Sequence, residues 1–512
     1  MTHVVESQDQ VFAWLAEPAT HGGAAVKRVD THAAVVFLTP ERVLKVKRAV
    51  RFPFLDFSTL DKRKAACEAE LAVNRPFAPD IYRRVVAITQ APDERLELDG
   101  RGTPVEWAVE MRRFDDTQTL DHLADAGRID SNLADTLGRV VAAAHARIQP
   151  AEPIPWITAL GAYIDEHRAA FGEMPDLFPV AQMDALARAS RTAYERVHPL
   201  LAERGRRGLI RRIHGDLHLG NIALIDGRPV LFDAIEFSEL IGSGDVLYDL
   251  AFLLMDLVER GLAGAANIVF NRYFTQAQRA EDLDALAALP LFLSMRAAIR
   301  AKVTAARLEQ VEPAMRSDIG VAARQYFDAA RRFIAPAAPH LVGIGGLSGT
   351  GKTVLARALA PELAPPPGAL VLRSDITRKV LLAADENARL PREAYADPVT
   401  MRVFAVVADQ AGRALAAGHS VILDAVYAGS DQRAAAEACA TGLGIRFHGL
   451  FLETALATRI ARVEGRRGDA SDADGAIARL QESYPLGELR WTRIDVSGTP
   501  EEVLARAKRA LA

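Results

Sequence analysis

The chain contains 512 residues, of which 50% are apolar and 25% are charged, and this ordinary composition argues against disordered, fibrous and membrane-embedded proteins. Its 62 basic and 66 acidic residues leave a net charge of −4, too even for a protein whose main role is to coat nucleic acid or an anionic membrane. The two cysteines, Cys67 and Cys439, suit a reducing compartment, and the polar N-terminus lacks an apolar segment. We therefore expect a cytoplasmic protein with no membrane partner.

The first two thirds of the chain begin with strand patterns and continue with helical ones. Residues 33–48 alternate around the turn at 39–41 and predict a hairpin, and 58–61 have the spacing of a capping box that opens a helix. Another strand pattern covers 105–114, and helical patterns dominate 116–333, apart from a strand-rich insert at 209–233. Strands followed by helices predict a two-lobed α+β domain, with an N-lobe over 1–115 and a C-lobe over 116–333.

The last third of the chain has a different pattern. Residues 334–340 are rich in Ala and Pro and predict a linker. Beyond it, the strand patterns LVGIGG, LVLRSD, SVILDA and RFHGLFLE alternate with helical segments. This alternation predicts an α/β domain with a parallel sheet over 341–512.

The segment IHGDLHLGN at 213–221, followed by PVLFD at 229–233, has the residue types and spacing of a phosphoryl-transfer site. In such a site one carboxylate accepts a hydroxyl proton, while an amide and a second carboxylate hold magnesium on the nucleotide phosphates. Asp216 is then the candidate base, and Asn221 and Asp233 are the candidate metal ligands. The structural alternative is a turn at His-Gly-Asp and a helix cap at Asp233.

These residues resemble the catalytic and metal-binding loops of the aminoglycoside phosphotransferase and choline kinase group, distant relatives of protein kinases. The resemblance covers about 1–330 and implies a protein-kinase-like fold that binds ATP. It also implies that the strand lysine Lys45 holds the phosphates and pairs with Glu70, with Glu68 as a rival partner. Lys47 lies on the same strand face and could exchange roles with Lys45. No G-x-G-x-x-G loop precedes the lysine.

The segment GLSGTGKT at 346–353 satisfies the pattern G-x-x-x-x-G-K-[ST] between a predicted strand and a predicted helix. Its backbone N–H groups are expected to wrap the β-phosphate, while Lys352 reaches the β/γ oxygens and the Thr353 hydroxyl binds Mg²⁺. The sequence therefore predicts a P-loop NTPase domain. The candidate nucleotide-binding residues are Gly346, Ser348, Gly349, Thr350, Gly351, Lys352 and Thr353.

Two carboxylates follow at predicted strand ends, Asp375 in LRSDITR and Asp424 in SVILD, where a parallel sheet collects ligand-facing residues. Asp424 is the candidate magnesium-side residue, although either aspartate could instead cap a helix. Further on, Arg459, Arg462 and Arg466 have helical spacing. They predict either a lid that stabilises the transferring phosphoryl group or a plain exposed basic face.

These segments make 341–512 resemble the small P-loop kinases, namely gluconate kinase, zeta-toxin-like kinases and the kinase half of polynucleotide kinases. The resemblance implies that Asp375 is the base for the acceptor hydroxyl and that Arg378 contacts substrate or phosphate. The whole arrangement resembles bacterial proteins labelled bifunctional aminoglycoside phosphotransferase/ATP-binding proteins, a label that names folds rather than a reaction.

We therefore expect an ATP- and Mg²⁺-dependent phosphotransferase with two nucleotide sites, each acting on a hydroxyl group of a small molecule. One alternative keeps a single domain catalytic and makes the other a nucleotide-binding regulatory module. A second alternative is a kinase for nucleic-acid ends, which the even charge balance disfavours. The motifs specify neither acceptor nor the oligomeric state.

Overall fold

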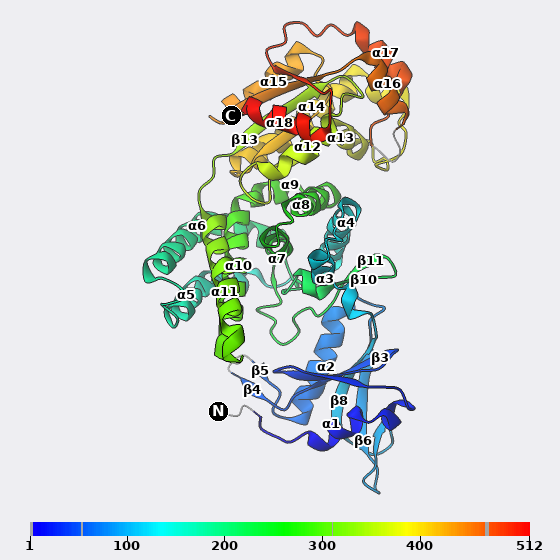
Figure 1. Ribbon diagram of the computed structural model, residues 1–512, viewed down its shortest axis with the longest axis vertical. Coiled ribbons are helices and arrows are strands. Elements are labelled where there is room, and N and C mark those ends of the chain that lie inside the picture. Colours follow the sequence, from blue (N-terminus) through cyan, green and yellow to red (C-terminus); the bar gives the residue numbers. More distant parts are fainter. Residues whose placement is uncertain (1–3, 53–54, 310, 466–469, 512) are drawn as a thin grey trace. The chain divides into compact units, whose positions relative to one another are not determined.

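The computed structural model describes residues 4–52, 55–309, 311–465 and 470–511. Figure 1 shows the helices and strands in chain order. The chain divides into two compact units. The first comprises Met1–Tyr163 and Pro199–Asp256, and the second comprises Ile164–His198 and Leu257–Ala512. The helices that follow Asp256 thus belong to the same unit as the last third of the chain, and the domain limits expected from the sequence remain a prediction.

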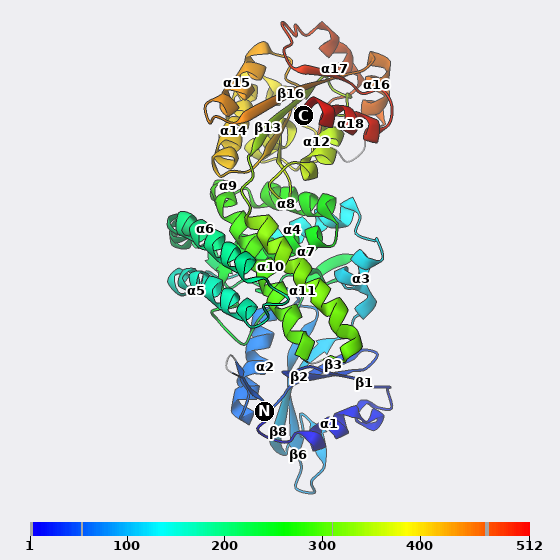
Figure 2. The ribbon, with the colours of Figure 1, turned by 60° about the vertical axis from the view of Figure 1, so that its left-hand side comes forward.

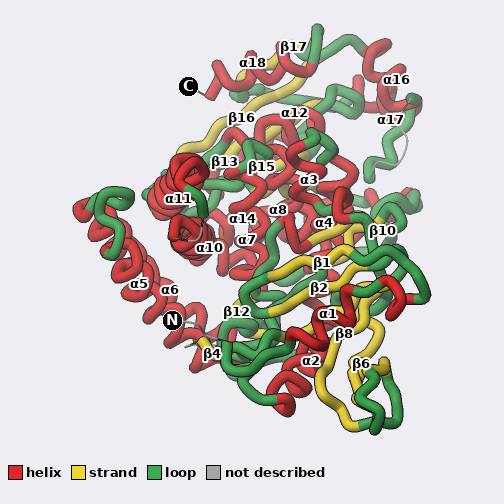
Figure 3. The backbone as a smooth tube through the Cα atoms, turned by 60° about the horizontal axis from the view of Figure 1, so that its bottom comes forward, coloured by secondary structure: helices red, strands yellow, loops and turns green. Residues whose placement is uncertain are grey.

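The N-terminal part of the first unit is an antiparallel six-stranded sheet, of which the strands β1 and β2 are seen side by side in Figure 3. In spatial order its strands are β1 (Lys27–Asp30), β2 (Ala34–Leu38), β3 (Arg42–Lys47), β8 (Thr103–Arg112), β6 (Tyr82–Gln90) and β7 (Leu96–Leu98). The predicted hairpin at 33–48 is confirmed by the pairing of β2 with β3. A short two-stranded ribbon, β4 (Arg51–Phe52) and β5 (Leu55–Asp56), lies beside it in sequence.

Two helices cover the two faces of this sheet. Helix α1 (Asp9–Ala16) packs Phe12 and Leu15 against Leu44 and Val46 of β3. Helix α2 (Leu60–Asn74) begins where the Thr59 hydroxyl accepts a hydrogen bond from the Lys62 N–H. Because side chains alternate along a strand, the lysines at 45 and 47 face α2, opposite to Leu44 and Val46.

The rest of the first unit carries the predicted phosphoryl-transfer loops on short strands between helices. Its elements are η2 (Asp116–Gln118), α3 (Leu120–Asp125), α4 (Ser131–Arg147), β9 (Ile210–Arg211), η3 (Leu219–Asn221), β10 (Ile222–Ile225), β11 (Arg228–Leu231) and β12 (Gly244–Asp245). The hairpin β10–β11 lies within the predicted strand-rich insert and connects the two loops. The helices α5 (Pro153–Gly172), α6 (Val180–Arg206) and α7 (Val246–Glu259) each have residues in both units.

The helical part of the second unit packs around aromatic side chains. It contains α8 (Ala263–Ala277), α9 (Ala280–Asp284), α10 (Leu289–Ala306) and α11 (Pro313–Ile334), and α10 and α11 lie side by side in Figure 2. The rings of Phe171, Phe178 and Phe327 have centroids 4.7–5.1 Å apart. Among the described residues, no helix has the length and apolarity needed to cross a bilayer.

The remainder of the second unit is a five-stranded parallel sheet, which confirms the predicted α/β class. In spatial order its strands are β14 (Leu370–Arg373), β15 (Val421–Asp424), β13 (His340–Gly346), β16 (Arg446–Glu453) and β17 (Thr492–Asp495). Helices α12 (Lys352–Leu359) and α18 (Pro500–Leu511) pack over one face, with α14 (Asp397–Ala416) and α15 (Ser430–Thr441) over the other (Figure 2). The further helices are α13 (Ser374–Leu381), α16 (Leu456–Glu464) and α17 (Gly475–Leu480).

Candidate active sites

The first candidate site begins at the lysines of β3. The Lys45 ammonium lies 2.8 Å from Glu70 Oε1 on α2 and 2.8 Å from Asp233 Oδ1. The predicted rival, Glu68, is exposed and lies 3.9 Å from Lys64 instead. The structure therefore brings together three predicted residues that are far apart in sequence, Lys45, Glu70 and Asp233.

Charge, rather than burial, determines the protonation states of this cluster. Burial by itself lowers the pKa of Lys45, but the nearby Asp233 and Glu70 carboxylates outweigh it and hold that pKa well above its usual value. Burial likewise tends to raise the pKa of Glu70, and the two lysines lower it below its ordinary range. The lysines and Glu70 are therefore charged at neutral pH and form a buried ion-pair cluster.

The candidate base and the candidate amide ligand lie on one short loop. Asn221 Nδ2 donates hydrogen bonds to the Asp216 main-chain oxygen at 2.9 Å and to Asp216 Oδ2 at 3.0 Å. The ring of His218 lies beside the same carboxylate, with Nε2 3.4 Å from Asp216 Oδ2. These contacts fix the Asp216 carboxylate relative to Asn221, which is the arrangement that a catalytic base and a metal ligand need.

Helix α7 holds this loop through two buried carboxylates. Asp249 accepts hydrogen bonds from the backbone N–H groups of His214 and Gly215, both at 3.0 Å, and lies 3.1 Å from His145 Nε2. Asp256 accepts a hydrogen bond from the Leu219 N–H at 2.9 Å. The contacts of Asp249 and Asp256 with the loop could not be predicted from the sequence, because they depend on how α7 packs.

The loop that carries Asp233 is fixed against α2 and β6. Asp233 has a positive φ of 62°, and its N–H donates to the Tyr82 hydroxyl at 3.1 Å. Asn74, in the last turn of α2, accepts from the Ala234 N–H at 2.8 Å and donates to the Ala234 oxygen at 3.3 Å. Tyr82 and Asn74 are thus positioning residues that sequence reasoning missed, since neither belongs to a motif.

The second candidate site is the P-loop between β13 and α12. Gly349 has a φ of 87°, and a Cβ atom there would lie 2.5 Å from the main-chain oxygen of Arg459, so only glycine fits. The Gln481 side chain accepts a hydrogen bond from the Ser348 N–H at 2.6 Å, and the Thr350 hydroxyl donates to the Leu347 oxygen at 2.8 Å. Gln481 was missed from the sequence because it lies 133 positions away from Ser348.

Two predicted residues of the P-loop site meet directly. The Thr353 hydroxyl donates to Asp424 Oδ2 at 2.6 Å, and Arg373 Nε lies 3.4 Å from the same oxygen. The Lys352 ammonium donates to the Leu347 oxygen at 3.4 Å, so it lies along the loop that it is expected to serve. Asp424 ends β15, as predicted.

Asp375 lies in the first turn of α13, because β14 already ends at Arg373, so the expectation that it ends a strand is corrected by two residues. Burial raises the pKa of Asp375 above its usual value, and the Arg373 charge opposes this. The expected contact of Arg378 with a substrate is not supported. Its guanidinium is buried, donates to the Ala394 oxygen at 2.6 Å and stacks over the Tyr395 ring at 4.7 Å.

The three spaced arginines do not form one exposed face. Arg459 is 1% exposed and donates to the Ala478 oxygen at 3.1 Å and to Glu482, so it joins α16 to the α17 region. Arg462 is exposed, and its Nη1 is 3.9 Å from the position of a Cβ on Gly351 of the P-loop. Arg466 lies outside the described residues. The expectation of a lid face is therefore wrong for Arg459, because helical spacing does not show what a face packs against.

The predicted metal ligands fit magnesium by their chemistry. Each site offers oxygen donors, the Asn221 amide and Asp233 carboxylate in the first and the Thr353 hydroxyl and Asp424 carboxylate in the second. Within the described ranges, no group of three or more His, Cys, Asp or Glu side chains could hold a metal ion alone. Mg²⁺ usually takes one or two protein ligands and completes its shell with substrate phosphates and water, so both donor sets suit it.

Comparisons with known proteins agree with this geometry. The phosphotransferase enzyme family matches residues 42–289, and an AAA domain family matches residues 341–484. Uncharacterized proteins from Mycobacterium tuberculosis (strain ATCC 25618 / H37Rv) and Mycobacterium bovis (strain ATCC BAA-935 / AF2122/97) are 30% identical to this chain, over 93% of it and 94% of theirs. The chain belongs to their family. It is an ATP-dependent phosphotransferase built from two kinase-type domains.

Two solved structures are similar to parts of this chain. A gluconokinase from Sinorhizobium meliloti 1021 is 20% identical and covers 34% of this chain and 91% of its own, with a TM-score of 0.26. A choline/ethanolamine kinase family protein from Mesorhizobium loti is 16% identical and covers 64% of this chain and 98% of its own, with a TM-score of 0.39.

Proposed function

We propose that both domains of this phosphotransferase are active and that each transfers the γ-phosphoryl group of ATP to a hydroxyl group of a small molecule. The observation that supports this best is the Asn221 amide bonded at 3.0 Å to Asp216, since it joins a candidate base to a candidate metal ligand. In the first site Asp216 accepts the proton of the acceptor hydroxyl, and Lys45, paired with Glu70, holds the nucleotide phosphates.

In the second site, different residues bind the phosphates and accept the proton. The backbone of the P-loop, from Gly346 to Thr353, surrounds the β-phosphate, and Lys352 reaches the β/γ oxygens. Asp375 accepts the proton of its acceptor hydroxyl, and its raised pKa suits proton uptake from a hydroxyl. Arg462 contributes charge from outside the loop, as does Arg466 in this proposal.

Magnesium, held by Asn221 and Asp233 in the first site and by Thr353 and Asp424 in the second, would neutralise charge on the phosphate oxygens. The chain's own contribution is to keep the donor oxygens close together, as the 2.6 Å bond from the Thr353 hydroxyl to Asp424 illustrates. We also propose a cytoplasmic location, in keeping with cysteines that are both free thiols.

A competing proposal makes one domain a nucleotide-binding regulatory module. It differs in one observable, because a regulatory module binds nucleotide without any acceptor-dependent turnover. A kinase for nucleic-acid ends is a further candidate for the second domain, and the net charge of −4 argues against it. Strongly salt-dependent binding of RNA or DNA oligonucleotides would favour it over a small-molecule kinase.

The first site is tested by Asp216→Asn in a chain whose P-loop site is disabled by Lys352→Ala. Transfer to the acceptor should fall by about 100- to 10,000-fold, because the base is lost while the metal ligands remain. ATP binding, measured by calorimetry, should stay close to that of the Lys352→Ala parent. Transfer at the parental rate would refute the assignment of Asp216.

The second site is tested by comparing Lys352→Ala with Asp375→Ala in the full chain carrying Asp216→Asn. Lys352→Ala should abolish nucleotide binding at the P-loop, whereas Asp375→Ala should keep binding and lose acceptor-dependent ADP release. Sugars, nucleosides, amino-alcohols and oligonucleotides form the acceptor panel. If no acceptor stimulates the Asp216→Asn parent, the regulatory proposal becomes the better one.

A further inference from the structure

A second lysine of β3, Lys47, has no part in the chemistry proposed above. Its ammonium lies 2.6 Å from Glu70 Oε2, while that of Lys45 lies 2.8 Å from Glu70 Oε1. Each oxygen of one fully buried carboxylate therefore holds one lysine. A kinase-like site needs a single lysine for the phosphates, and this site contains two.

The two lysines continue to two residues of one loop. Lys45 reaches Asp233 Oδ1 at 2.8 Å, and Lys47 pairs with Glu236, three residues further along. The result is two parallel bridges from α2 to the loop that carries the predicted metal ligand. One runs from Glu70 through Lys45 to Asp233, and the other runs from Glu70 through Lys47 to Glu236.

The two bridges differ in their access to a ligand. The side chains of Asp233 and Lys45 are 47% and 17% exposed, so this bridge opens toward solvent. The Lys47 side chain is 3% exposed and that of Glu236 is 9% exposed. The Lys47 ammonium also lies over the Phe57 ring, 5.5 Å from its centroid. A nucleotide can therefore draw Lys45 away from Asp233, whereas Lys47 is enclosed.

We propose that Lys47 is a positioning residue for the first site, a role that rests on the function proposed for that site. Its buried bridge from Glu70 to Glu236 keeps the Asp233 loop against α2 while Lys45 exchanges Asp233 for the nucleotide phosphates. Glu70 keeps a cationic partner throughout this exchange, so the helix does not need to move. Loss of Lys47 then weakens the binding of magnesium by the Asp233 loop. Loss of Lys45 instead weakens the binding of the nucleotide phosphates.

The test is a titration of the full chain carrying Lys352→Ala with the non-hydrolysable analogue AMP-PNP at a series of Mg²⁺ concentrations. Lys47→Met should need at least about tenfold more Mg²⁺ for half-maximal binding, as is usual when a residue supporting a metal ligand is lost. Lys47→Arg should bring the Mg²⁺ concentration for half-maximal binding most of the way back to the parental value, because a guanidinium can still bind two carboxylates. Lys45→Met should weaken binding at every Mg²⁺ concentration, and Lys27→Met, on exposed β1, should change nothing.

Three results would overturn the proposal. One is a folded Lys47→Met with the parental Mg²⁺ dependence. Another is loss of binding at all Mg²⁺ concentrations in Lys47→Met but not in Lys45→Met, which would mean that the lysines have exchanged roles. If thermal unfolding shows that Lys47→Met does not fold, Glu236→Gln replaces it and should show the raised Mg²⁺ requirement. The third overturning result is a Glu236→Gln variant with the parental Mg²⁺ requirement.

This readout needs no acceptor, so it separates the role of Lys47 from the function of the site. A parent that binds AMP-PNP with Mg²⁺ but transfers no phosphate would refute the proposed kinase activity and leave the role of Lys47 standing. A parent whose first site binds no AMP-PNP would refute both.

Discussion

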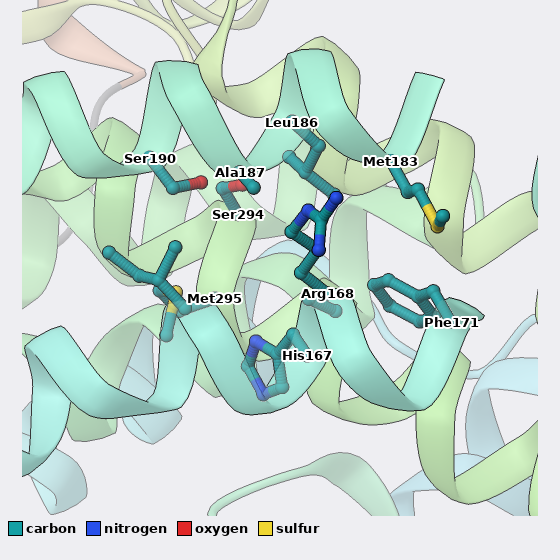
Figure 4. Close-up of a pocket in the computed structure, with 11 residues that line it drawn as sticks. His167, Arg168, Phe171, Met183, Leu186, Ala187, Ser190, Ser294 and Met295 are labelled. Carbon is teal, nitrogen blue, oxygen red and sulfur yellow. The ribbon is translucent and has the colours of Figure 1, made fainter. Parts of the chain in front are cut away.

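The described residues include buried ionisable side chains of two kinds, some charged beside a partner and some held neutral by burial. Lys47 and Glu70 belong to the first kind. His167 belongs to the second. It lies on α5 in a small pocket lined by apolar side chains such as Phe171 and Met295 together with Arg168 and two serines (Figure 4). Burial, and to a smaller extent the charge of Lys302, lowers the pKa of His167 to about 3. A neutral histidine of this kind makes the stability of the second unit depend on pH.

Acidification should destabilise the second unit through His167. The unfolded chain takes up a proton near pH 6.5, whereas the folded chain does not until about pH 3, so stability present above pH 6.5 is lost as the pH falls between these values. At pH 5 this one group should cost about 2 kcal/mol relative to pH 8. His167→Leu removes the titrating group, so between pH 8 and pH 5 its thermal midpoint should fall less than that of the wild type. Equal falls in both proteins would show that His167 is protonated in the folded state.

At the residue scale, sequence reasoning succeeded where a motif dictates both residue type and spacing. The predicted site residues Asp216 and Asn221 lie within hydrogen-bond distance of each other, and Thr353 contacts Asp424. It failed for Arg459, whose helical spacing with Arg462 is real but whose side chain is buried against α17. Spacing along a helix predicts which residues share a face, and only tertiary packing determines what covers that face.

At the scale of the elements, the P-loop depends on a close approach between two backbones. A Cβ on Gly349 would lie 2.5 Å from the Arg459 oxygen, and these backbone atoms have no free rotation by which to move away. Gly349→Ala should therefore displace the loop and abolish nucleotide binding at the second site. Calorimetry of the Asp216→Asn chain, which keeps the first site's binding, should then show one nucleotide-binding event in place of two.

Gly418→Ala is the matched control for this prediction. Gly418 has a similar φ of 81°, but nothing lies within 4 Å of its Cβ position. In both variants an alanine must adopt the left-handed conformation, which costs about 1–2 kcal/mol. Only in Gly349→Ala does the new Cβ also clash with backbone atoms. If the two variants bind nucleotide equally well, the close approach at Gly349 has no functional role.

Helix α8 completes the open edge of the parallel sheet. Asn271 Oδ1 accepts from the Val371 N–H of β14 at 2.7 Å, and its Nδ2 donates to the Ala369 oxygen at 3.1 Å, as a neighbouring strand would. Asn267 donates to the oxygens of Pro367 and Ala369 at 3.2 and 3.1 Å. The strand that leads to Asp375 is thus held by side chains of a helix 100 residues earlier in the chain.

Asn271→Ala should loosen β14 by leaving the Val371 N–H without its acceptor, at a cost of about 1–3 kcal/mol. Hydrogen exchange followed by mass spectrometry should show faster exchange in peptides covering 370–373 of the full chain. Asn132→Ala, at an exposed position of α4, should leave this exchange unchanged. Unaltered exchange in Asn271→Ala would mean that the sheet edge is stable without α8.

Element patterns predicted four of the five strands of the parallel sheet, but not the edge strand β17 or the contacts that cover the other edge. Four of the parallel strands were visible as apolar runs bounded by turns, whereas β17 is mostly exposed and gave no such run. The cap of β14 by α8 was invisible because asparagine in a helix gives no local signal. Contacts of this kind join segments that are far apart in the sequence, and hydrophobic periodicity does not predict which distant segments meet.

At the scale of the whole molecule, the chain carries two sets of candidate phosphoryl-transfer residues. One set, around Asp216, lies in the first compact unit, and the other, around Lys352 and Asp375, lies in the second. The sequence predicted both sets, because each follows from motifs of short span. The extent of the compact units was less accessible, since the helices after Asp256 belong with the P-loop sheet through contacts such as that of Asn271.

The most direct test of two separate kinase sites is acceptor-dependent ADP release by four full-length proteins, namely the wild type, Asp216→Asn, Lys352→Ala and the double variant. Across the acceptor panel, each single variant should lose one class of acceptor and keep the other at the wild-type rate, and the double variant should lose both. Loss of all turnover in one single variant, with full turnover in the other, would contradict the account and leave this protein with one catalytic site.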